Sequence, residues 1–105
     1  AYNPLYLLGP SGDERRGLLA SIGNAVRDGA PGRVVAFVTG AEFGEELIAA
    51  LERGQLEAWR ARYRRADALL LDDLEALEGT ERAQEELFHL FEELHRAGRQ
   101  LVFAA

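Results

Sequence analysis

Four short apolar runs alternate with amphipathic segments along the chain. The runs are Leu5–Leu8, Val34–Val38, Ala68–Leu71 and Leu101–Phe103. Uninterrupted apolar runs of this length are typical of strands that are buried on both faces of a parallel sheet.

The segments between these runs carry apolar residues at helical spacing. We expect one helix from about Asp13 to Arg27, two helices around residues 43–51 and 56–63, and a fourth from near Thr80 to just before Gly98. This alternation predicts an α/β protein with a parallel sheet of about four strands and helices on both faces.

The turn after the first run has the position of a phosphate-binding loop but lacks its chemistry. The pattern G-x-x-x-x-G-K-[ST] needs a second glycine, a lysine for the phosphates and a hydroxyl for magnesium. Here those places hold Glu14, Arg15 and Arg16, and the 105 residues contain no lysine. Acidic residues at the helix start stabilise the helix and repel a phosphate.

Arginine differs from the residues that it replaces in this pattern. Arg15 keeps the positive charge of a lysine, but its planar guanidinium is bulkier, and Arg16 has no hydroxyl. We therefore predict loss of nucleotide hydrolysis. The alternative is that Arg15 and Arg16, together with Gly9 and Gly12, hold a nucleotide in an unusual way.

Composition narrows the possible functions. The chain is 48% hydrophobic and carries a net charge of −6, which disfavours sequence-independent binding to nucleic acid. It has no cysteine, and no apolar run approaches the roughly 18 residues of a membrane span. We expect a cytoplasmic, single-domain protein that does not enter a membrane.

Four blocks of sequence, in order, resemble one family. They are Asn3–Gly9, Ile22–Asn24, Leu69–Leu74 and Gln84–His89. The chain resembles the AAA+ core of the bacterial replication initiator DnaA and its relatives. The resemblance implies a P-loop NTPase fold, with residues 1–105 forming one truncated core segment, and it places the sensor 1 residue, the arginine finger and the lid beyond Ala105.

The resemblance also assigns roles to particular residues. Asp72 and Asp73 would be the Walker B pair, with Asp72 holding magnesium through water and Asp73 polarising the attacking water. It further implies an initiator-specific insertion at about residues 42–65, with Ile48 and Arg82 as contacts to single-stranded DNA. A neighbouring basic position in the family is Thr80 here.

The arginines around Trp59 allow two interpretations. Trp59 and Tyr63 with the nearby arginines would form a stacking surface with phosphate contacts, or the rings face the core and the arginines are solvated. The second interpretation is favoured because both rings share one helix face.

Two functions follow from these observations. The first is an AAA+ module that is inactive as an ATPase, needs no cofactor and acts through a protein partner or self-association, with the first strand as an edge open to a partner. The alternative is a divergent initiator segment that binds ATP or ADP with magnesium and binds origin or single-stranded DNA.

Overall fold

The computed structural model describes residues 3–9 and 12–105, so Pro10 and Ser11 of the predicted turn lie outside the described residues. The elements in chain order are β1 (Leu5–Leu7), α1 (Gly12–Gly29), β2 (Val35–Thr39), α2 (Gly40–Glu52), α3 (Leu56–Arg64), β3 (Ala68–Asp72), the 3-10 helix η1 (Leu74–Leu77), α4 (Glu81–Arg96) and β4 (Gln100–Ala104). All four predicted strands and all four predicted helices are present.

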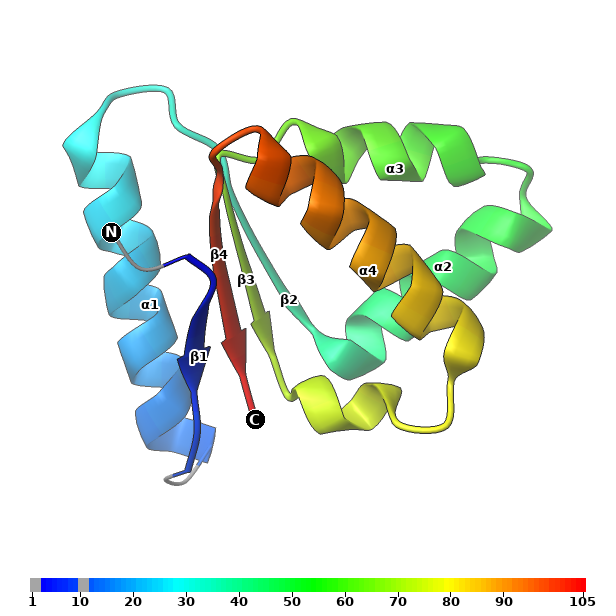
Figure 1. Cartoon of the computed structure of the whole chain (residues 1–105), viewed down its shortest axis with the longest axis horizontal. Coiled ribbons are helices and arrows are strands. Elements are labelled where there is room, and N and C mark those ends of the chain that lie inside the picture. Colours follow the sequence, from blue (N-terminus) through cyan, green and yellow to red (C-terminus); the bar gives the residue numbers. More distant parts are fainter. Residues whose placement is uncertain (1–2, 10–11) are drawn as a thin grey trace.

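One parallel sheet organises the molecule. The strand order is β1-β4-β3-β2, and every neighbouring pair is parallel. Helix α1 covers one face of the sheet, while α2, α3 and α4 lie on the other (Figure 1). The α/β class, the parallel sheet of four strands and the helices on both faces are therefore confirmed.

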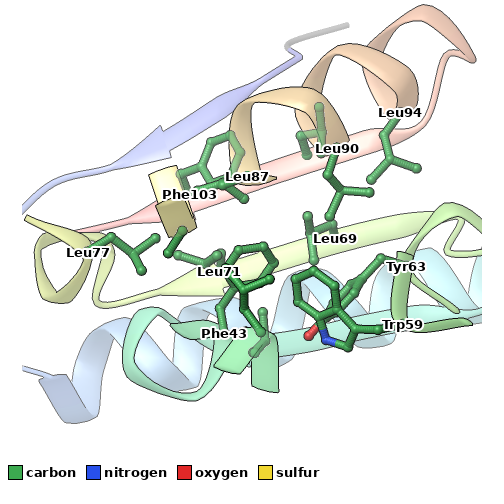
Figure 2. Packing of buried hydrophobic residues seen from close by; sticks show 14 of the residues in the cluster. Phe43, Trp59, Tyr63, Leu69, Leu71, Leu77, Leu87, Leu90, Leu94 and Phe103 are labelled. Carbon is green, nitrogen blue, oxygen red and sulfur yellow. The ribbon is translucent and has the colours of Figure 1, made fainter. Parts of the chain in front are cut away.

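The two faces of β3 and β4 supply the two parts of the core. Because side chains alternate along a strand, Leu69 and Leu71 point to the side of α2, α3 and α4, whereas Leu70 points toward α1. The larger cluster packs leucines of α4 against three aromatic rings, Phe43, Trp59 and Tyr63 (Figure 2). Their ring centroids lie 5.0–5.7 Å apart, which is the range for tilted and edge-to-face aromatic pairs.

Burial on both faces is confirmed for β3 and β4 but is wrong for β1 and β2. Tyr6 is 57% exposed on β1, and Phe37 is 46% exposed on β2. The reason is the strand order, which places β1 and β2 at the two edges of the sheet. The prediction that the first strand forms an edge is confirmed within the described residues.

Smaller differences concern the element ends. The second strand begins at Val35 rather than Val34. Its last residue, Thr39, caps α2 through a reciprocal pair of hydrogen bonds with Glu42. The short helix η1 was not predicted. In residues 3–9 and 12–105, no helix is both long enough and apolar enough to span a membrane.

Candidate functional site: the carboxyl end of β3

The paired aspartates lie where β3 ends. In an open α/β sheet this carboxyl end is where ligands are usually bound. Asp72 is the last residue of β3 and is only 3% exposed. Asp73 follows with a left-handed backbone (φ 56°), and its N–H donates a hydrogen bond of 2.8 Å to Asp72 Oδ1. The turn at Asp73 leads directly into η1.

The first turn of α1 brings a positive charge to the same carboxylate. Arg15 Nε donates a hydrogen bond to Asp72 Oδ1 over 2.6 Å, although the two residues are 57 positions apart. Their side chains are 14% and 4% exposed, so water screens this ion pair little. The Asp72 carboxylate raises the pKa of the Arg15 guanidinium above its ordinary value.

Glu75 of η1 completes the charged cluster. Its Oε1 lies 4.0 Å from Arg15 Nη2. Hydrogen bonding between the Asp73 and Glu75 carboxyl groups raises the pKa of Asp73 and lowers the pKa of Glu75. Sequence reasoning missed Glu75, and the only available signal was an acidic residue two positions after the aspartate pair.

Gly40 at the start of α2 packs against the backbone of this turn. A Cβ atom at Gly40 would lie 2.4 Å from the Asp73 carbonyl oxygen and 3.3 Å from the Ala76 Cβ. The absence of a side chain at Gly40 therefore lets α2 approach the aspartate turn closely.

The remaining residues of the predicted loop do not join this cluster. Gly9 has a left-handed backbone (φ 86°) and donates its N–H to the Ala105 carbonyl over 3.3 Å, while Gly12 is the first residue of α1. Arg16 is 67% exposed and pairs with exposed Asp13 over 3.4 Å. Of the two arginines predicted at the phosphate site, only Arg15 is close to Asp72.

The charged cluster does not fit a magnesium nucleotide in the arrangement described. Magnesium takes oxygen ligands in a near-octahedral shell, usually with one or two carboxylates and several waters. Here Asp72 Oδ1 already accepts hydrogen bonds from Arg15 Nε and from the Asp73 N–H. A divalent cation at this oxygen would also be repelled by the guanidinium 2.6 Å away.

The two predicted DNA-contact residues lie together at a second place. Ile48 of α2 is 56% exposed, and it lines a cavity of about 250 Å³ that Arg82 and Thr80 also line. Arg82 forms an ion pair of 3.3 Å with Glu86 and is itself 49% exposed. Their assignment as DNA contacts stays a prediction.

The core interpretation of Trp59 and Tyr63 is confirmed. The two residues are 8% and 4% exposed and pack within the larger core cluster. The neighbouring arginines form ion pairs: Arg60 with Glu57 and Glu86, Arg62 with Glu46, and Arg64 with Glu57 and Glu93.

Two glutamates tie the helices together, and sequence reasoning assigned them no role. Glu46 Oε1 accepts hydrogen bonds from the Trp59 indole, the Arg62 guanidinium and the Tyr63 hydroxyl. Glu86 is buried and accepts a bidentate pair from Arg60. The sequence offered one signal for Glu46 and Glu86, which is that each glutamate lies within the apolar face of its helix.

The parallel sheet, the helix that follows β1 and the aspartate pair at the end of β3 fit the expected AAA+ domain of the P-loop NTPase class. Comparison with known proteins makes the assignment specific. The sequence model for the bacterial DnaA ATPase domain matches residues 1–105. The chain belongs to the bacterial DnaA ATPase domain family.

Individual relatives agree with this assignment over the whole chain. The chain is 45% identical to the chromosomal replication initiator protein DnaA of Herpetosiphon aurantiacus and 44% identical to that of Roseiflexus castenholzii, each over 105 residues. These matches cover 100% of this chain, which spans 22% of the length of either relative.

Solved structures show the same fold. Domain III of the Thermotoga maritima replication initiation protein DnaA has a TM-score of 0.93 at 39% identity, covering 99% of this chain and 44% of that one. A replication initiator DnaA bound to AMPPCP and single-stranded DNA has a TM-score of 0.92 at 33% identity, covering 99% and 32% of the two chains. An AMPPCP-bound DnaA from Aquifex aeolicus also has a TM-score of 0.92, at 32% identity, covering 100% of this chain and 32% of that one.

Proposed function

We propose that this chain is a DnaA-type ATPase fold that has lost ATP hydrolysis and acts through protein interaction, as a regulatory or scaffolding module. The observation that carries the proposal is the contact between Arg15 and Asp72. It joins the residue at the lysine position of the phosphate loop to the carboxylate that would serve magnesium. The acidic helix start and the missing hydroxyl at Arg16 support the same proposal.

Calorimetric titration with ATP and ADP in the presence of magnesium tests the loss of nucleotide chemistry. The matched variant combines Glu14→Gly, Arg15→Lys and Arg16→Thr, which rebuilds the phosphate-loop pattern. We expect no binding heat from the unmodified protein and measurable binding by the repaired variant, with circular dichroism confirming that both are folded. Magnesium-dependent ATP turnover by the unmodified protein that disappears in Asp72→Ala/Asp73→Ala would overturn the proposal.

A surface suited to protein interaction lies along β1. Among the described residues, β1 pairs with β4 on one side and forms the edge of the sheet on the other. Exposed Tyr6 on this strand and Phe88 of α4 border an apolar cavity of about 260 Å³. Unpaired strand edges with apolar neighbours are templates for strand addition by another chain.

Self-association through this edge is tested by sedimentation velocity. We expect Tyr6→Lys to weaken association while the monomer stays folded, because the substitution places a charge on the edge. Phe37→Lys is the matched control, since Phe37 is a half-exposed aromatic residue on β2 at the opposite edge. A monomer at high protein concentration would exclude this mode.

The second candidate function is binding of single-stranded DNA. It is favoured by one observation, the position of Ile48 and Arg82 on the same cavity between α2 and the start of α4. A relative that is 33% identical was solved with single-stranded DNA. An exposed apolar side chain beside an arginine is suited to contact a base and its phosphate.

Fluorescence anisotropy with a labelled single strand tests this candidate. We expect Ile48→Ala/Arg82→Ala to weaken binding several-fold if the cavity contacts DNA. Leu18→Ala/Arg27→Ala removes an equal charge and a similar apolar side chain from α1, on the opposite face of the sheet, and serves as control. Equal affinities of the two double variants would exclude the cavity as the DNA site.

A further inference from the structure

The charged cluster at the end of β3 carries an inference beyond the proposed function. The contact between Arg15 and Asp72 supports the proposed loss of ATP hydrolysis, on which this inference rests. The same contact also has a structural role of its own, because it gives the Asp72 carboxylate a partner in the folded protein.

The geometry of the contact is that of a structural ion pair. The Nε to Oδ1 distance of 2.6 Å is at the short end of charge-assisted hydrogen bonds. Both side chains are largely buried, and the Arg15 guanidinium reaches toward Glu75 as well. Arg15 belongs to α1 and Asp72 to β3, so the pair joins the only helix described on that face of the sheet to one of its two inner strands.

Arg15 supplies a positive charge to the carboxylates at this place. Asp72 and Glu75 present carboxylate charge to Arg15, and the Asp73 N–H satisfies the same Asp72 oxygen. Arginine is suited to this role because its planar guanidinium stays charged and donates along fixed directions. Removing one partner of a buried ion pair strongly destabilises a protein because the other charge stays buried without a partner. We therefore expect the Arg15–Asp72 pair to stabilise the folded state.

We propose that Arg15 is the resident cation of the Walker B site. A side chain takes the place of a divalent ion, and Asp72 is retained to hold α1 on the sheet instead of serving a nucleotide. The closed pair excludes magnesium from Asp72 in the folded protein, whether or not nucleotide is present.

Thermal unfolding without nucleotide tests this proposal. The variants are Arg15→Ala, Asp72→Asn and the double variant, with Arg16→Ala as control because Arg16 is exposed. Each single variant should lower the melting temperature by about 5 °C or more, and the double variant should lower it by clearly less than the sum. Arg16→Ala should leave the melting temperature nearly unchanged. Additive effects of the two single substitutions would overturn the proposal.

A second measurement starts from the unmodified protein and does not depend on Arg15→Ala being folded. Titration of the unmodified protein with Mn²⁺, followed by electron paramagnetic resonance, should show no bound ion at millimolar concentration. If Arg15→Ala folds, it should gain Mn²⁺ binding that Asp72→Asn removes. Binding of Mn²⁺ by the unmodified protein that is lost in Asp72→Asn would overturn the proposal. Because no ATP is used, such a failure would leave the proposed loss of hydrolysis to be decided by the ATP titration.

Discussion

Glu46 offers the sharpest test of how the α2–α3 pair is held. One carboxylate oxygen, Oε1, accepts hydrogen bonds from Trp59 Nε1 at 3.0 Å, Arg62 Nη2 at 2.9 Å and the Tyr63 hydroxyl at 2.6 Å. Glu46→Ala removes all three acceptor contacts at once. Since Trp59 and Tyr63 are 8% and 4% exposed, their donors would lose a partner in a mostly dry environment.

The magnitude follows from the burial of the donors. A buried donor without a partner costs about 1–3 kcal/mol, whereas the guanidinium of Arg62, 60% exposed, regains water. The two buried donors, Trp59 Nε1 and the Tyr63 hydroxyl, together would cost about 2–6 kcal/mol. A cavity of about 270 Å³ beside Glu46 and Trp59 gives water access to part of the space that the carboxylate leaves, which favours the lower half of this combined range. We expect Glu46→Ala to reduce the free energy of unfolding by about 2–4 kcal/mol.

Urea unfolding followed by Trp59 fluorescence measures this loss directly, because Trp59 is the only tryptophan in the chain. Far-UV circular dichroism on the same samples checks that unfolding is a single transition. Glu45→Ala is the matched control, since Glu45 is exposed and should change stability by less than about 0.5 kcal/mol. Equal midpoints for the two variants would refute the assignment of Glu46 as the shared acceptor.

Two further predictions concern the aspartate turn and alkaline pH. Gly40→Ala should destabilise the protein by about 1–3 kcal/mol because its Cβ would meet the Asp73 carbonyl at 2.4 Å. Gly17→Ala, which meets nothing within 4 Å on α1, should be neutral or stabilising by up to about 1 kcal/mol in the same thermal unfolding assay. Equal losses would refute the steric argument. Burial and the hydrogen bond to Glu46 raise the pKa of Tyr63 above its ordinary value of 10.0. The folded state therefore favours the neutral phenol, and the resulting stability is complete below pH 10 and is lost as pH rises further. Melting temperatures at increasing alkaline pH should fall less steeply for Tyr63→Phe than for the control Tyr6→Phe, and parallel curves would contradict the prediction.

Apolar runs predicted the strands well but not their places in the sheet. Leu69 and Leu101 lie on strands with neighbours on both sides, so a continuous apolar run corresponds there to burial on both faces. Tyr6 and Phe37 belong to similar runs but lie on edge strands and are half-exposed. The order of the strands in the sheet depends on how the crossover connections run, and it cannot be predicted from the composition of a single apolar run.

Two residues of the candidate site, Arg15 and Asp72, could be predicted from the sequence, but their contact could not. Spacing identified Arg15, because it stands at the lysine position of the phosphate-binding pattern, whereas the family resemblance identified Asp72 as a Walker B residue. Their direct contact joins residues 57 positions apart and depends on how α1 lies on β3. The close approach of Gly40 to the Asp73 carbonyl is likewise a property of packing between elements.

Retention of the aspartate pair is therefore weak support for hydrolysis in this chain. If Asp72 stabilises the fold through Arg15, its presence is accounted for by packing and does not depend on a working phosphate loop. Restoring the lysine pattern would then act in two opposing directions. It opens the carboxylate to magnesium, but it also removes the guanidinium that holds α1 on the sheet. The repaired variant should consequently be less stable than the unmodified protein without ligand, and magnesium nucleotide should recover that loss by binding the folded state.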